Sequence, residues 1–308
     1  MSTILAVDVG GSGLRAQRVD AVASSSERFE SAGAAITPGG IDLEQLLAPV
    51  AAFDARHRSR PDVVVWSMRG LLGLSDPQHV LRQVHSRLGA LRTVVASDAV
   101  ASLVGALGEV RPGAVLAAGS GVVAFATDFA EVWRLVDGWG HVLADRGSAA
   151  WIGLEGLRVA LATEDRVPGG STYLHEAAVE AWGEPRTWPR AVMTTSDAQA
   201  RLAAFAPLVA SLAGKDAVAA RVVSRAAAHL VDSLESAISS VSGASATAVG
   251  GLLHIPEVSA AFEAETRRRG IHLAVASGTA LDGALALGRH VGEGRALRAR
   301  APYLLWSA

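Results

Sequence analysis

Two aspartates that follow apolar strands are the first candidates for chemistry in this chain. Asp8 closes the apolar run that begins at Ile4, and Asp98 follows the apolar run 93–96. A glycine-rich segment comes directly after Asp8 and consists of Gly10, Gly11, Ser12 and Gly13. Glycine has no Cβ, so its backbone N–H groups can approach phosphate oxygens closely. A carboxylate beside phosphates requires a cation between them, which predicts ATP at this loop and Mg²⁺ at Asp8. An ordinary hairpin turn is the alternative.

A second group of candidate residues lies between positions 119 and 251. Two short turns could approach a nucleotide through their backbone, although plain hairpins would look the same; they are Gly119-Ser120-Gly121 and Gly250-Gly251. A densely patterned loop runs Gly138-Trp139-Gly140-His141 and continues as Asp145-Arg146-Gly147-Ser148. Trp139 could stack on a sugar ring, and Asp145 could accept hydrogen bonds from sugar hydroxyls. Trp139 and Trp151 could instead be core aromatics.

These motifs together resemble the sugar-kinase branch of the actin-like ATPases, and specifically the N-acetylglucosamine kinases of the BadF/BadG type. The match is densest in the loop 138–148 and extends over most of the chain. The resemblance implies an α/β, two-domain actin-like ATPase fold, related to ribonuclease H, with a cleft between the domains. It also implies that ATP phosphorylates an amino sugar, with N-acetylglucosamine at its 6-hydroxyl as the first choice.

The resemblance assigns roles to individual residues. Asp98 is expected to be the general base that accepts the sugar hydroxyl proton, while its position also suits a helix cap. His141 is expected to pack or to donate a hydrogen bond, because Asp98 fills the role of base. The expected nucleotide contacts are Gly10, Gly11, Ser12, Gly13, Arg15, Gly119, Ser120, Gly121, Gly250 and Gly251. The expected sugar contacts are Arg69, Asp98, Gly138, Trp139 and Asp145.

The chain departs from the family pattern around the expected sugar pocket. It contains no asparagine, and Ile36 occupies the place where the family has one that contacts the sugar. Arg69 replaces a small residue, Arg146 replaces the glutamate of an Asp-Glu-Gly motif, and Gly13 stands where a basic residue is common, which leaves Arg15 as the nearest cation. Alternative acceptors are therefore glucosamine, a related aminocyclitol or an acidic amino sugar. A non-catalytic sugar or nucleotide sensor is the alternative of another class.

Composition limits the remaining functions. With no cysteine among 308 residues, thiolate catalysis and cysteine-bound iron–sulfur clusters are excluded, and so are the electron activators of this family. A net charge of −2 leaves no basic surplus for nucleic acid or an anionic membrane. The start has no basic flank and no apolar run reaches about 18 residues, so we expect a cytoplasmic protein. A homodimer is also expected.

The order of expected elements supports two α/β domains. Strands are expected at 4–8, 14–19, 63–66 and 93–96, and helices at 43–58, 77–88 and from Ala99. A break at Arg111-Pro112-Gly113 predicts a boundary between a domain at 1–112 and one at 113–308, the last helix being able to return to the first. The second domain is expected to begin with strands at 114–118, 122–127 and 132–136 and a helix at 148–162. It continues with helices up to residue 242, a strand at 247–249, a helix at 256–269, a strand at 271–275 and a helix at 280–291. The apolar spacing at 230–241 is expected to face the core or another subunit.

Overall fold

The chain divides into two compact units. The computed structural model describes residues 2–10, 13–20, 25–33, 36–37 and 40–307. Unit 1 comprises Met1–Gly113, Ala126–Trp133 and Val275–Ala308, and unit 2 comprises Ala114–Phe125 and Arg134–Ala274. The last helix and the hairpin 126–133 therefore group with unit 1. The expected folding domains, 1–112 and 113–308, remain a prediction, because compactness alone does not test which segments fold independently.

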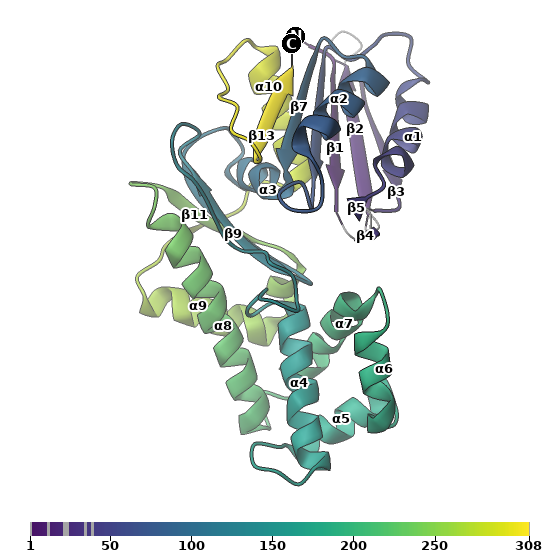
Figure 1. Cartoon of the computed structure of the whole chain (residues 1–308). Coiled ribbons are helices and arrows are strands. Elements are labelled where there is room, and N and C mark those ends of the chain that lie inside the picture. Colours follow the sequence, from purple (N-terminus) through teal and green to yellow (C-terminus); the bar gives the residue numbers. More distant parts are fainter. Residues whose placement is uncertain (1, 11–12, 21–24, 34–35, 38–39, 308) are drawn as a thin grey trace. The chain divides into compact units, whose positions relative to one another are not determined.

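Unit 1 is built on one mixed β-sheet (Figure 1). Its strands are β1 (Ile4–Val9), β2 (Leu14–Asp20), β3 (Ser25–Ser31), β6 (Val63–Met68), β7 (Arg92–Ser97) and β13 (Leu304–Ser307). They lie in the order β13-β7-β6-β1-β2-β3. Because β1, β6 and β7 are parallel, their carboxyl ends meet at one edge, with Asp8 in register with Ser67 and Met68 with Ser97. A separate small ribbon pairs β4 (Ile36–Thr37) with β5 (Gly40–Ile41).

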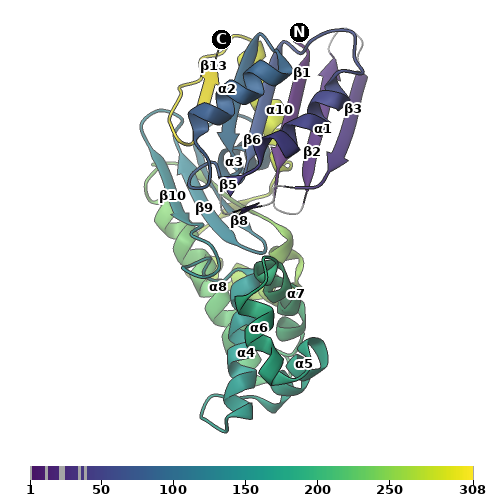
Figure 2. The same ribbon diagram turned by 45° about the vertical axis from the view of Figure 1, so that its right-hand side comes forward.

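Helices cover both faces of this sheet. They are α1 (Leu43–Asp54), α2 (Pro77–Leu88), α3 (Asp98–Leu107) and α10 (Ala280–Gly292). Helices α1 and α2 lie side by side on one face (Figure 2), where Phe53, Trp66 and Met68 join a continuous apolar core. Helix α10 packs on the other face and lies so close to α3 that a Cβ at Gly105 would come within 1.9 Å of the Thr279 carbonyl oxygen. The helices on the two faces together hold in place the sheet edge at which Asp8 and Asp98 lie.

Most of the second sheet and a group of helices form unit 2. The strands are β8 (Gly113–Ala118), β9 (Val122–Thr127), β10 (Trp133–Asp137), β11 (Ser245–Val249) and β12 (Leu273–Ala274), in the order β10-β9-β8-β11-β12. The helices are α4 (Ala149–Glu164), α5 (Thr172–Trp182), α6 (Trp188–Met193), α7 (Ala198–Ser211), α8 (Ala217–Ile238) and α9 (Pro256–Arg268), with single 3₁₀ turns at Pro185–Thr187 and Gly251–His254. Helix α4 requires Gly153 against α7, since a Cβ there would lie 1.9 Å from the Leu202 carbonyl oxygen.

The expected strands and helices recur in the structure, with end points that differ by a few residues. The first helix ends at Asp54 rather than at 58, and the helical pattern at 230–241 is the end of α8, which stops at Ile238 and buries Leu230 and Leu234. Strands β3 and β13 and the two-residue strands β4 and β5 were not predicted from the sequence. In the part of the chain that the structure describes, no helix is both long and apolar enough to cross a membrane.

Candidate active site

Asp8 lies at the carboxyl edge of the unit 1 sheet with little room for water. The residue is 9% exposed, and Ser67 Oγ on β6 donates to Asp8 Oδ1 at 3.3 Å. Burial, assisted by the negative charge of Asp98, raises the pKa of Asp8 to about 6. A buried carboxylate next to a second carboxylate is a costly arrangement in the absence of a counter-charge. This part of the edge is therefore suited to a cation.

Asp98 is the first residue of helix α3, directly after β7. Burial raises the pKa of Asp98, while the Ala99 N–H, which donates to Asp98 Oδ1 at 2.9 Å, and the charge of Arg69 act in the opposite direction. The cap of α3 is Ser97, whose hydroxyl accepts from the Val100 N–H at 3.4 Å. Ser97 therefore supplies the N-cap side chain of α3, and Asp98 adds one further hydrogen bond at this N-terminus, from the Ala99 N–H. The Asp98 carboxylate is thus available for chemistry with a pKa suited to accepting a proton.

The other predicted residues of unit 1 lie around the same edge. The Arg69 N–H donates to the Val9 carbonyl oxygen at 3.0 Å, and its guanidinium is near enough to act on Asp98. Arg15 is paired in register with Asp8 on β2, yet its side chain is 54% exposed and 4.0 Å from Glu30. The Gly10 N–H donates to the Gly13 carbonyl oxygen at 2.9 Å, so these two glycines lie close together. Gly11 and Ser12 lie outside the described residues, so the phosphate role of the segment 10–13 stays a prediction.

In unit 2 the turn Gly119–Gly121 is tied to the start of helix α4. The Gly119 N–H donates to the Gly121 carbonyl oxygen at 2.8 Å, and the Ala149 and Ala150 N–H groups donate to the carbonyl oxygens of Gly119 and Ser120 at 3.0 and 3.2 Å. The first-turn donors of α4 are therefore used within the protein, and a phosphate would have to meet the turn itself rather than the helix N-terminus. We call Gly119–Gly121 the unit 2 glycine turn.

Gly250 lies against this same turn. Its φ of +115° is left-handed, and a Cβ at Gly250 would come within 2.1 Å of the carbonyl oxygen of Ala118, the residue before Gly119. Both features require glycine at this position. A Cβ added at Gly251 would have no other atom within 4 Å, so packing does not explain why a glycine occupies this position. The structure therefore brings together two segments that are more than 100 residues apart in the chain, as the predicted nucleotide site requires.

The loop from Gly138 to Asp145, which we call the acceptor loop, combines exposed and buried residues. Trp139 is 70% exposed and so is not a core aromatic. His141 is partly buried, and this burial lowers the pKa of its imidazole. Asp145 is only 3% exposed: its Oδ1 accepts from the Gly140 N–H at 3.1 Å and its Oδ2 from Gln199 Nε2 at 3.4 Å. The predicted contacts of Gly138, Trp139 and Asp145 with a sugar stay predictions, and Asp145 has a clear internal role in addition.

The side chains around Asp8 can hold Mg²⁺ only if the nucleotide and water supply most of the ligands of the metal ion. Among the described residues, no three His, Asp or Glu side chains cluster as a metal site would require. Mg²⁺ commonly uses one or two carboxylates, with water and phosphate oxygens completing its octahedron. Asp8 meets that modest requirement, because it is a buried carboxylate that accepts from Ser67 and is repelled by Asp98.

Comparison with known proteins supports the resemblance seen in the sequence. Residues 51–285 match the BadF/BadG/BcrA/BcrD ATPase family. The chain belongs to this family. No curated protein matches its sequence.

Solved structures share the fold at low identity. A proposed N-acetylglucosamine kinase from Chromobacterium violaceum superposes with a TM-score of 0.73 at 22% identity, covering 93% of this chain and 99% of that one. A proposed N-acetylglucosamine kinase from Porphyromonas gingivalis gives 0.68 at 18% identity, with coverage of 95% and 100%. A ROK family glucokinase from Streptomyces griseus, in complex with glucose and AMPPNP, gives 0.58 at 19% identity, with coverage of 94% and 99%. The family member described here thus has the expected α/β, two-domain actin-like ATPase fold.

Sequence reasoning did not find every residue that shapes these loops. Gln199, which donates to Asp145, and Ser233 and Asp137, which hydrogen-bond to each other, carry no local motif. The one available signal was the acidic residue at position 137, directly before the glycine of the acceptor loop. The partners lie 54 and 96 positions away in sequence, so only the tertiary structure joins them.

Proposed function

We propose that this protein transfers the terminal phosphoryl group of ATP to an amino sugar, with N-acetylglucosamine as the acceptor and its 6-hydroxyl as the site. The observation that carries this proposal is the pair Asp8 and Asp98 at one sheet edge, both with raised pKa, in a member of an ATPase family. Relatives of similar fold described as sugar kinases support the choice of acceptor class.

In the proposed reaction Asp98 accepts the proton of the sugar hydroxyl as that oxygen attacks the γ-phosphorus. The new O–P bond forms while the bond to the β-phosphate oxygen breaks, and ADP leaves. The raised pKa of Asp98 makes its carboxylate a better proton acceptor than an ordinary aspartate. Asp8 would hold Mg²⁺, which neutralises phosphate charge when bound. The proposed nucleotide contacts are the segment 10–13, the unit 2 glycine turn, and Gly250 with Gly251.

Arg69 supports a neutral amide in preference to a free amine on the acceptor. Its guanidinium acts electrostatically on Asp98, so a positive charge is present beside the proposed base. A guanidinium remains charged at neutral pH and repels the ammonium group of glucosamine, whereas it can donate hydrogen bonds to an N-acetyl carbonyl oxygen or to a carboxylate. The acceptor preference therefore follows from Arg69.

A panel of amino sugars with ATP in a coupled ADP-release assay tests the proposal. We expect kcat/KM for N-acetylglucosamine to exceed that for glucosamine at pH 7. Arg69→Ala should lower the ratio of kcat/KM for N-acetylglucosamine to that for glucosamine. Arg69→Lys keeps the positive charge and should still favour N-acetylglucosamine. Faster phosphorylation of glucosamine would overturn the role of Arg69 but not the kinase proposal. Absence of acceptor-dependent ADP release with every amino sugar would overturn the kinase proposal itself.

A further inference from the structure

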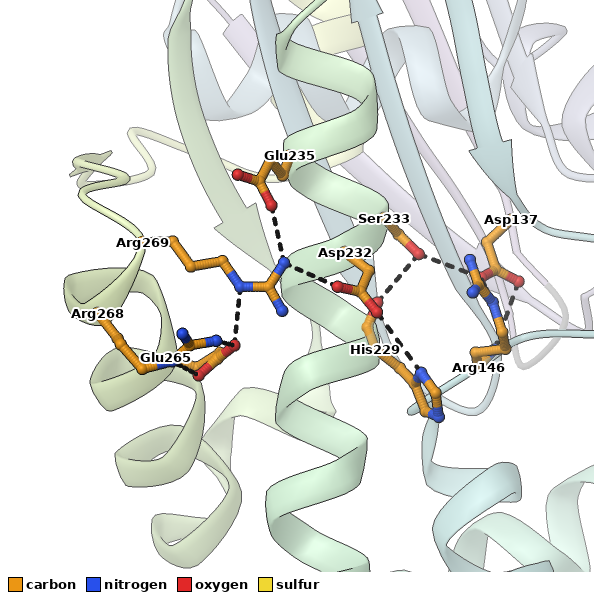
Figure 3. A network of polar contacts seen from close by, with 9 residues as sticks. All are labelled: Asp137, Arg146, His229, Asp232, Ser233, Glu235, Glu265, Arg268 and Arg269. Atoms are coloured by element: carbon orange, nitrogen blue, oxygen red, sulfur yellow. Dashed lines mark hydrogen bonds and ion pairs between the residues drawn. The ribbon is translucent and has the colours of Figure 1, made fainter.

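The two ends of the acceptor loop are joined by a buried carboxylate. Asp137 directly precedes the loop and Arg146 directly follows it (Figure 3). Arg146 Nε donates to Asp137 Oδ2 at 3.1 Å, and the Arg146 N–H donates to Oδ1 at 3.4 Å. Ser233, on helix α8, donates through Oγ to Asp137 Oδ2 at 3.1 Å. The Asp137 side chain is only 1% exposed, so this ion pair and its hydrogen bonds are shielded from water on one side.

Asp137 adopts a backbone conformation that most residues avoid. Its φ is +64°, in the left-handed region, which costs a non-glycine residue about 1 kcal/mol or more. A glycine would take this turn without strain. The strained backbone is retained because three hydrogen bonds hold the carboxylate. The conformation thus depends on the side chain, which indicates a specific role for it.

The closed loop carries Asp145, which lies between two candidate binding segments. Asp145 also has a left-handed φ, of +51°. Its Oδ1 holds the Gly140 N–H inside the acceptor loop, and its Oδ2 lies so close to Gly121 that an added Cβ would be 2.5 Å away. One side chain therefore contacts the acceptor loop and the unit 2 glycine turn at the same time. A shift of Arg146, the next residue in the chain, would move both.

The same network of polar contacts continues along α8 to the end of α9, because Asp232 pairs with both His229 and Arg269, and the His229 carbonyl oxygen lies 3.1 Å from Ser233 Oγ. Arg269 of this network lies 2.7 Å from Glu235 Oε2 and 2.8 Å from Glu265 Oε1 (Figure 3). The Glu235 side chain is 50% exposed, and its ion pair with Arg269 links α8 to the end of α9. Glu235 thus lies at the far end of this network from Asp137 and does not contact the acceptor loop in any hydrogen bond or ion pair of the described residues.

We propose that Asp137 is a positioning residue for phosphoryl transfer. Through its contacts with Arg146 and Ser233 it holds the two ends of the acceptor loop together and keeps Asp145 in position between that loop and the unit 2 glycine turn. This inference rests on the proposed function for its kinetic readout. It goes beyond that function because it assigns a role to three residues, Asp137, Arg146 and Ser233, that contact neither substrate in the proposed reaction.

The experiment compares Asp137→Asn, Arg146→Gln, their double variant, Arg146→Lys and the control Glu235→Gln. We expect kcat/KM for N-acetylglucosamine to fall about 10- to 100-fold in the first two, the effect of a misplacement of about 1 Å. The dissociation constant of a non-hydrolysable ATP analogue should also rise, since Gly121 moves with Asp145. The double variant should lose no more than the worse single variant, because both remove one interaction. Arg146→Lys should recover most of the loss.

Glu235→Gln removes an ion pair from the same helix and is expected to keep wild-type kinetics and analogue affinity. Wild-type values of both in Asp137→Asn and Arg146→Gln would overturn the proposal. Additive losses in the double variant, or losses matched by Glu235→Gln at equal melting temperature, would overturn it as well. If the wild type binds the analogue but phosphorylates no amino sugar, the proposed function fails, and the analogue affinities still decide whether Asp137 positions the glycine turn.

Discussion

The aspartates of the two units differ in how their carboxylates are used. Asp8 and Asp98 in unit 1 have raised pKa values, because burial outweighs the hydrogen bonds that they accept from Ser67 and Ala99. In unit 2, Asp137 accepts from Arg146 and Ser233, and Asp145 accepts from Gly140 and Gln199. Carboxylates without enough donors are suited to bind a proton or a cation, whereas carboxylates supplied with donors fix a loop. The difference separates the aspartates that we propose to be reactive from those that we propose to position a loop.

The largest expected effect would come from removing the proposed base. Asp98→Asn should lower kcat by about 10²–10⁴-fold, with affinity for an ATP analogue little changed. Thermal stability should be kept, because burial disfavours the charge that the substitution removes. Ser97→Ala is the matched control: it removes the actual cap of α3 and should cost about 1 kcal/mol of stability with a far smaller loss of turnover. Near-wild-type turnover in Asp98→Asn would place Asp98 among the structural aspartates.

A second test concerns the metal role of Asp8. Asp8→Ala should raise the Mg²⁺ concentration needed for half-maximal ADP release by about 10-fold or more, because a carboxylate ligand is lost. Titrations of Mg²⁺ at saturating ATP and N-acetylglucosamine measure the change. An unchanged Mg²⁺ requirement would show that Asp8 resembles Asp137 in being structural.

A third test separates two glycines of the unit 2 glycine turn. Gly121→Ala should destabilise the fold by about 1–3 kcal/mol, since the new Cβ would lie 2.5 Å from Asp145 Oδ2. Gly119→Ala has nothing within 4 Å of the added Cβ and should leave the melting temperature nearly unchanged. Thermal unfolding of both variants gives the answer. Equal melting temperatures for Gly121→Ala and Gly119→Ala would mean that Asp145 moves aside freely and does not fix the position of the unit 2 glycine turn.

The smallest effect is expected at Glu265 of helix α9, which pairs with Arg268 and Arg269. The hydrogen bond from Arg268 is the largest factor that lowers the pKa of Glu265 to about 2, and Arg269 adds to it. Because the pKa in the folded protein lies below the ordinary value of 4.5, stabilisation by this group is complete above that value and is lost as the pH falls towards 2. Glu265→Gln should lower the melting temperature slightly at pH 7, with a difference from wild type that shrinks between pH 5 and pH 3. A difference that does not vary with pH would exclude the ionic contribution.

Several parts of the fold could be predicted from local patterns. The hairpin of β1 and β2, the helix Pro77–Leu88 and the strands before the acceptor loop follow from apolar periodicity and from glycine, because both act over a few residues. The family also followed from the sequence, since the loop 138–148 keeps specific residue types at fixed spacing. The edge strands β3 and β13 were missed, because the pattern of β3 is polar and β13 is a four-residue strand at the end of the chain.

The sequence by itself determined which residue types were available for chemistry: aspartates after strands, glycines in turns, and no cysteine or asparagine. Only the tertiary structure decided how each aspartate is used. At the start of α3, Ser97 supplies the N-cap hydroxyl, while Asp98 accepts a hydrogen bond from the Ala99 N–H. The sequence offered Asp145 as a sugar contact, which stays a prediction, and only the structure shows that its carboxylate also accepts hydrogen bonds from Gly140 and Gln199. The physical reason is that burial and hydrogen-bond donors set the charge and the contacts of a carboxylate, and both come from segments far away in the chain.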